Sequence, residues 1–202
     1  MVKRSRDKKA KLDAIRMLVL DVDGVMTDGT IVVDSEGRES KFFSVLDGHG
    51  IKMWKRAGLQ TAFLSGRKSG PTKQQADELA IDYCLEDCKD KLVCLRELMR
   101  LSGLSIEQIA YVGDDLPDLP VIRCAGFAAA VANAVDEVKK AADYITTRKG
   151  GQGAVREVIE YILKKTGKWE GLMKKYLAKQ PEKTDVNKSK SVWCLALFRT
   201  GS

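Results

Sequence analysis

The chain has 202 residues, 44% of them hydrophobic, which is enough for one domain with a substantial core. Its net charge of +7 lies at the two ends, because residues 1–16 carry seven Lys or Arg against two acids and residues 164–202 carry ten against three. The stretch between these ends is acidic on balance, which argues against a basic nucleic-acid-binding face.

Cysteine usage and hydropathy narrow the class of protein further. The five cysteines (84, 88, 94, 124 and 194) include no pair spaced C-x-x-C, and His49 is the one histidine of the sequence. A structural zinc site is therefore not expected. The cysteines are instead expected to be reduced thiols in a cytoplasmic protein. We find no signal peptide and no apolar segment long enough to cross a membrane, so no membrane partner is expected.

The first predicted element is a short buried strand over residues 17–20, which is apolar and partly β-branched. It ends at Asp21, and a second acid, Asp23, follows two residues later. Residues 30–34 and 38–44 predict a β-hairpin around a Gly-containing link. The two glycines within 47–50 are expected to interrupt the chain before a helix over 51–57.

The rest of the chain alternates strands with helices. Strands are predicted at 59–64, 81–85, 109–112, 126–131 and 142–146, and helices at 71–80, 89–101, 116–124, 135–142 and 154–165. This order predicts right-handed crossovers and an α/β fold, a Rossmann-like three-layer sandwich with a central parallel sheet and a small β-hairpin flap. No interval is long enough for a cap domain. We expect a basic extension at 1–13, the domain at 14–166, and a mobile basic tail at 167–202.

Polar side chains follow three of the predicted strands where each strand ends. Asp21 and Asp23 follow the first strand, Ser65 the strand at 59–64, and Asp114 with Asp115 the strand at 109–112. Ligands of open α/β sheets bind at the carboxyl ends of the strands, and Lys91 begins a helix on the same side. Each residue alone would more often belong to a turn or a helix cap. Together they provide a nucleophile, a second acid, a cation and metal ligands, the set that phosphoryl transfer requires.

These motifs resemble those of a known family. Residues 21–27 (Asp-Val-Asp-Gly-Val-Met-Thr), 64–67 (Leu-Ser-Gly-Arg), Lys91 and 112–115 (Val-Gly-Asp-Asp) are similar to the four ordered motifs of haloacid dehalogenase-like hydrolases. Residues 18–50, 62–67, 109–115 and 148–157 are similar, more specifically, to the acid-sugar phosphatases of that superfamily. The similarity runs from about residue 14 to residue 166.

The resemblance implies a role for each motif. Asp21 would attack phosphorus and form an aspartyl phosphate, and Asp23 would protonate the leaving alcohol and then activate water. Ser65, Gly66 and Lys91 would bind the phosphoryl group. Mg²⁺ would be the cofactor, held by Asp21, Asp23 through its backbone carbonyl, Asp114 and Asp115. The presence of the second acid, Asp23, also argues against dehalogenase chemistry, which requires no proton transfer to a leaving alkoxide.

The resemblance also implies a substrate, a small-molecule sugar phosphate. Arg67 favours 3-deoxy-D-manno-octulosonate 8-phosphate, a precursor in lipopolysaccharide synthesis, and Thr27 is a further expected substrate contact. A nonulosonate 9-phosphate stays an alternative, because Gln75 stands where relatives often carry Arg. A phosphatase-like assembly module of the acylneuraminate cytidylyltransferase type is the other alternative. A homotetramer is implied too, since a lone two-stranded ribbon carrying Ile31, Val33, Phe42 and Val45 needs a packing partner.

Overall fold

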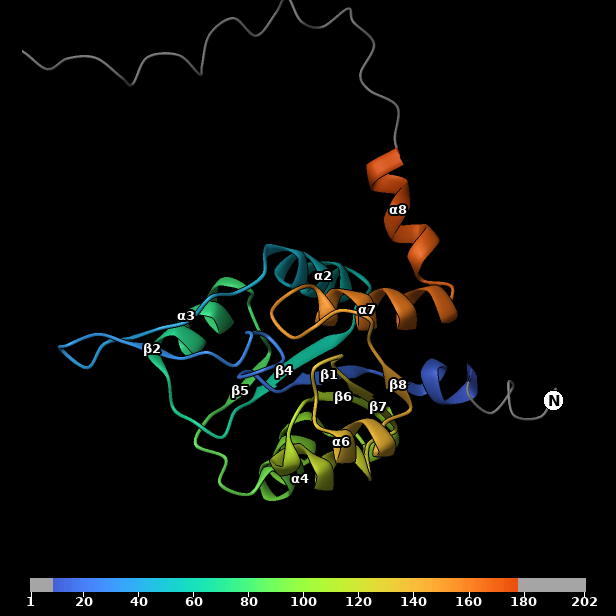
Figure 1. The fold of residues 1–202 in the computed structure, drawn as a ribbon. Coiled ribbons are helices and arrows are strands. Elements are labelled where there is room, and N and C mark those ends of the chain that lie inside the picture. The colour runs from blue at the N-terminus through green and yellow to red at the C-terminus, as the bar shows by residue number, and fades with distance from the viewer. Residues whose placement is uncertain (1–8, 178–202) are drawn as a thin grey trace, which may run out of the picture.

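The computed structural model of the chain describes residues 9–177. Six parallel strands form one sheet in the order β5-β4-β1-β6-β7-β8, at the centre of the domain (Figure 1). The strands are β1 (Met17–Leu20), β4 (Gln60–Leu64), β5 (Tyr83–Leu85), β6 (Ile109–Gly113), β7 (Phe127–Ala130) and β8 (Tyr144–Ile145). Every predicted strand of the sheet is present, and the predicted parallel architecture is confirmed.

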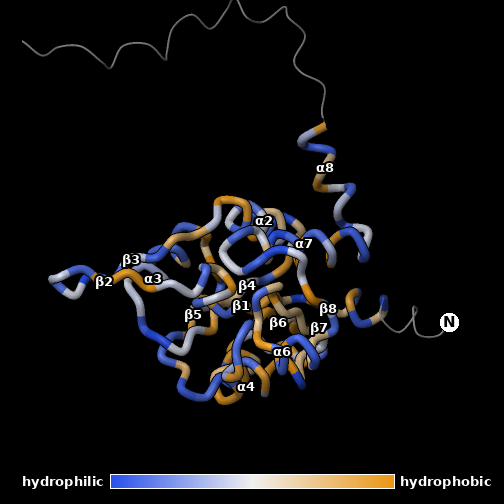
Figure 2. Tube along the Cα trace, in the orientation of Figure 1, coloured by the Kyte–Doolittle hydropathy of each residue, from blue (hydrophilic) through white to orange (hydrophobic). Residues whose placement is uncertain are grey.

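Helices cover both faces of the sheet and complete the predicted three layers. Figure 1 shows α2 (Val45–Arg56) and α7 (Ala154–Lys165) on one face, with α4 (Lys91–Ser102) and α6 (Asp136–Ala141) on the other. Shorter helical elements lie in the connections between strands: α3 (Gly70–Glu78), α5 (Leu119–Ile122) and the short 3₁₀ turns η1 (Ile106–Gln108) and η2 (Leu116–Asp118). All residues of β1, β6 and β7 are buried, as expected of a sheet covered on both faces, and Figure 2 shows apolar residues concentrated in these strands.

Helix α2 begins at Val45, six residues earlier than predicted, so the expected interruption at 47–50 was wrong. Glycine disfavours a helix by about 1 kcal/mol, but a close contact with α7 requires it here. A Cβ on Gly50 would lie 2.9 Å from Cδ of Arg156. The buried Asp47 carboxylate also accepts hydrogen bonds from the backbone N–H groups of Gly153 (3.1 Å) and Arg156 (2.8 Å) at the start of α7. Tertiary packing therefore outweighs local propensity.

The predicted hairpin is present but has shorter strands. β2 (Val32–Val33) and β3 (Glu39–Ser40) pair antiparallel, where residues 30–34 and 38–44 were predicted. The turn closes through the Asp34 N–H, which donates to the carbonyl of Arg38, and Gly37 adopts a left-handed φ of +78°. The hairpin projects from the sheet (Figure 1), and between β1 and α2 the described chain holds no other regular element.

The two ends of the described chain differ from expectation. Residues 9–14 are helical and bury Leu12, so part of the predicted extension joins the core. The predicted tail begins with helix α8 (Trp169–Leu177), where the Arg56 guanidinium donates to the Tyr176 hydroxyl over 2.6 Å. The rest of the predicted tail, 178–202, lies outside the described residues. Among residues 9–177, no helix has the length and apolarity needed to traverse a bilayer.

Candidate active site

The site lies where β1 meets its two neighbours. Asp21, Ser65 and Asp114 are each the first residue after β1, β4 and β6, and these three strands are adjacent. The hydrogen-bond pattern between β1 and β6 continues into the site, because the Asp21 N–H donates to the Val112 carbonyl over 3.0 Å. The chain builds β4 and β5 on one side of β1 and then crosses to β6, β7 and β8 on the other side, so the acids lie at a topological switch point, where α/β sheets bind ligands.

Lys91 joins two carboxylates within this site. Its Nζ lies 2.7 Å from Oδ1 of Asp21 and 2.5 Å from Oδ1 of Asp118. Burial alone would lower the pKa of Lys91, but these two acids outweigh it and raise the pKa above its ordinary value. Asp90 caps α4 by accepting from the backbone N–H of Leu92 (2.9 Å), which fixes the helix end that carries the lysine.

Three carboxylates form a cluster that fits a hard divalent cation. One oxygen from each of Asp21, Asp114 and Asp118 lies within 4.8 Å of the others. Burial and the Asp118 charge raise the pKa of Asp21 well above its usual range and that of Asp114 to about 6. Asp114 Oδ1 is buried and accepts no hydrogen bond from the described residues. A cation that takes carboxylate oxygens would satisfy this atom and relieve the repulsion.

Asp118 is a site residue that the sequence analysis missed. Its Oδ1 accepts from the Tyr111 hydroxyl (2.5 Å) and its Oδ2 from the backbone N–H groups of Asp114 (2.9 Å) and Asp115 (3.2 Å). The expected ligand Asp115 is instead exposed, and its carboxylate accepts from the Leu116 N–H at the start of η2. The spacing of Asp118, one helical turn after Asp114, was the available signal.

The loop after β1 requires glycine and uses its own threonine. Gly24 has a φ of +97°, and a Cβ there would lie 2.0 Å from Oδ2 of Asp114, so no side chain fits. The buried Thr27 hydroxyl donates to the Val22 carbonyl (3.4 Å) and accepts from the N–H groups of Gly24 and Gly29 (3.2 Å each). Thr27 therefore shapes the loop, and its contacts give no support to the expected role in substrate binding.

The remaining predicted residues surround this loop. Ser65 is buried, and its Oγ accepts from the Arg67 N–H over 3.3 Å, across Gly66. The Arg67 side chain is half exposed, with Nη2 3.8 Å from Oε2 of Glu39 in the hairpin. The Asp23 carboxylate is 21% exposed and pairs with Lys41, a second residue that the sequence analysis missed.

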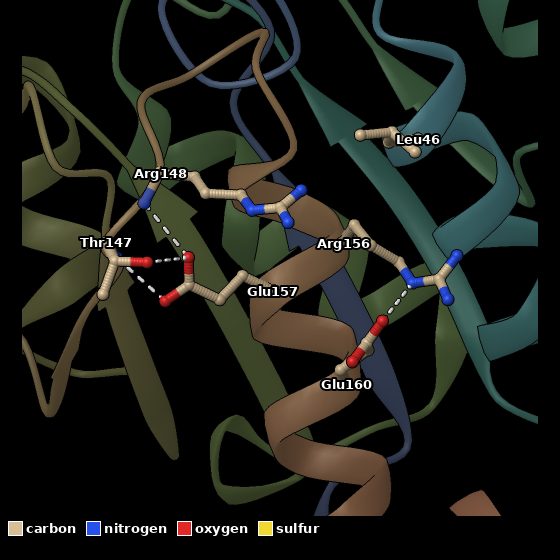
Figure 3. Close-up of a pocket in the computed structure, with 6 residues that line it drawn as sticks. All are labelled: Leu46, Thr147, Arg148, Arg156, Glu157 and Glu160. Carbon is tan, nitrogen blue, oxygen red and sulfur yellow. Dashed lines mark hydrogen bonds and ion pairs between the residues drawn. The ribbon is translucent and has the colours of Figure 1, made fainter.

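A separate hollow of about 480 Å³ lies beside the start of α7. Figure 3 shows its lining, with Leu46 from α2 above the two arginines. Its acids already have partners: Glu157 accepts from the backbone and hydroxyl of Thr147, and Glu160 from Nε of Arg156 over 2.7 Å. This hollow offers no free carboxylate for a metal ion, so the acidic cluster is the better candidate for catalysis.

The sheet, the acids after β1 and the lysine between two carboxylates together define a Rossmann-like hydrolase site. In agreement with this class, a family model of the haloacid dehalogenase-like hydrolases matches residues 85–159. The chain belongs to the haloacid dehalogenase-like hydrolases.

Individual relatives cover most of the chain. The 3-deoxy-D-manno-octulosonate 8-phosphate phosphatase KdsC of Escherichia coli (strain B / BL21-DE3) is 40% identical over 164 residues, 81% of this chain and 87% of that protein. The structure of the same-named phosphatase from Moraxella catarrhalis, in complex with magnesium ion, phosphate ion and KDO, shares 40% identity, with a TM-score of 0.81 over 83% of this chain and 97% of that one. The Yersinia pestis phosphatase gives 41% identity and a TM-score of 0.79 over 82% and 89%.

Proposed function

We propose that this chain hydrolyses 3-deoxy-D-manno-octulosonate 8-phosphate to the free sugar acid and phosphate, with Mg²⁺ as cofactor. One observation carries the proposal: in this chain, which is 40% identical to KdsC of Escherichia coli, the Lys91 Nζ lies 2.7 Å from Oδ1 of Asp21, the acid that directly follows the central strand β1. This reaction would belong to lipopolysaccharide precursor synthesis in the cytoplasm.

Asp21 would act as the nucleophile of the reaction. Its carboxylate ends β1, and Lys91 holds its Oδ1 in one orientation. Attack on phosphorus would form an O–P bond to Asp21 and break the bond to the sugar oxygen, while Asp23 donates a proton to that oxygen. Asp23 would then take a proton from the water that hydrolyses the aspartyl phosphate.

Asp21 and Asp114, with the backbone carbonyl of Asp23, would hold the magnesium ion. When bound, Mg²⁺ supplies positive charge against the phosphoryl oxygens. Lys91 and the Ser65 hydroxyl add donors at the same edge of the sheet. Asp118 would support these groups without contacting the substrate, because it binds both Lys91 and the backbone of the loop that carries Asp114.

Turnover on a panel of acid-sugar phosphates, with and without Mg²⁺, tests the proposal. We expect the highest kcat/KM on the eight-carbon 8-phosphate, because Arg67 offers a planar cation to the substrate carboxylate, and little turnover in EDTA. Arg67→Lys should lower kcat/KM on this substrate by about tenfold through the loss of a bidentate contact. A higher kcat/KM on a nonulosonate 9-phosphate would overturn the assignment, and no turnover on any of them would favour an assembly module.

We propose further that the chain forms a homotetramer through its hairpins. Five apolar side chains of the hairpin and the start of α2 are exposed: Val32, Val33, Phe42, Val45 and Leu46, with Val45 86% and Phe42 73% exposed. Exposed apolar groups on the projecting hairpin and the adjoining start of α2 support an interface, since burying them removes apolar surface from water.

Phe42→Asp is expected to lower the oligomeric mass and the activity together. The substitution places a charge in the proposed interface, and Phe42 immediately follows Lys41, which contacts Asp23. Light scattering with parallel activity assays measures both effects. Val93→Asp, on α4 and 55% exposed, is the matched control and should change neither. A wild-type monomer with full activity would refute the shared-interface proposal.

A further inference from the structure

The side chain of Lys41 is the least exposed cation near the site. It follows β3 directly, and none of its side chain is exposed, although the neighbouring Phe42 is 73% exposed. Lysine is almost never fully buried without a partner, because transfer of an ammonium group from water costs several kcal/mol. Its surroundings therefore have to supply compensating charge.

Two carboxylates and a hydroxyl provide that compensation. The Lys41 Nζ lies 2.6 Å from Oδ1 of Asp23 and 3.4 Å from Oε1 of Glu39. It also donates to Oγ1 of the buried Thr72 in α3, over 3.2 Å. The ammonium is thus held from β3, from α3 and from the loop after β1, which restricts where it can move.

The contact matters more for Asp23 than for Lys41. Asp23 Oδ1 is buried and accepts no directed hydrogen bond from the described residues, and the ammonium 2.6 Å away is the charge that faces it. A carboxyl group that donates a proton to a leaving oxygen needs a fixed position, because a misplacement of about 1 Å can lower the rate roughly 100-fold.

We propose that Lys41 is a positioning residue that orients the Asp23 carboxylate for proton transfer to the leaving group. The inference rests on the proposed phosphatase function and adds a residue from the hairpin to it. Glu39 supports the same arrangement, because its Oε1 accepts from the Ser69 hydroxyl (3.2 Å) while lying beside Lys41.

Two substrates separate positioning from a general structural role. An alkyl phosphate such as the sugar 8-phosphate needs a proton on its leaving oxygen, whereas p-nitrophenyl phosphate releases a stable p-nitrophenolate and needs little protonation. We expect Lys41→Met to lower kcat/KM on the sugar phosphate by about 100-fold and on the aryl phosphate by less than about tenfold. Lys164→Met, a half-exposed lysine on α7, is the control and should leave both unchanged.

A double variant tests whether Lys41 acts through Asp23. In an Asp23→Asn background, Lys41→Met should add little further loss on the sugar phosphate, because the group it orients is gone. Equal losses on both substrates, or fully additive losses in the double variant, would overturn the inference while leaving the proposed function intact. Absence of wild-type turnover on both substrates would overturn the function and this inference together.

Discussion

Replacement of Asp21 by Asn is expected to reduce turnover of the sugar phosphate by roughly 10⁴–10⁶-fold, the loss typical of a missing nucleophile. An amide keeps the shape of the side chain and still accepts from Lys91, but it does not form the acyl phosphate. Steady-state assays of phosphate release measure the loss. Retained turnover would refute covalent catalysis at this residue.

The same substitution is not expected to unfold the protein. Burial and Asp118 raise the pKa of Asp21, so its ionised form is disfavoured in the fold, and a neutral amide removes that penalty. The melting temperature of the metal-free variant should therefore equal or exceed that of the wild type. Asp28→Asn is the matched control from the same loop, because Asp28 is exposed and its carboxylate accepts a hydrogen bond from the Thr30 N–H over 2.8 Å. It should retain turnover.

The elements that sequence patterns predicted best are those whose signals are local. Helix α7 begins and ends as predicted, because a glycine precedes its amphipathic run and Gly167 follows it. Strand β1 also matches, because a buried parallel strand is a continuous apolar run bounded by polar residues. For such elements the period and the end signals agree with the tertiary structure.

The features that were missed depend on contacts between distant segments. The start of α2 was missed because glycine is expected to interrupt a helix. Only the tertiary structure shows that the side chain of Arg156 packs against Gly50. Lys41 belongs to the site only because the chain returns from the projecting hairpin to the loop after β1, and no residue spacing reports that approach. Asp118 was missed because its sequence neighbours indicate only an acidic residue in a short helix. Its partner Lys91 is 27 residues away along the chain.

Substitution of Lys91 by Met is expected to destabilise the metal-free protein by about 3–5 kcal/mol, the usual cost of removing one member of a buried ionic group. Lys91 is 6% exposed, and its loss leaves the carboxylates of Asp21 and Asp118 buried and facing one another without a cation. Thermal and urea unfolding in EDTA measure the effect. Lys89→Met, two residues away and 81% exposed, should be neutral.

The double variant Lys91→Met/Asp118→Asn separates stability from catalysis. An amide at 118 can still accept from the Asp114 N–H, and its NH₂ can donate to the Tyr111 hydroxyl, so the loop keeps its hydrogen bonds while one buried charge is removed. Stability should therefore recover most of the loss seen in Lys91→Met. Turnover should stay low, because no ammonium remains to face the phosphoryl oxygens. If turnover recovered with stability, Lys91 would serve only the fold; if stability did not recover, the Asp118 charge would not be what Lys91 compensates.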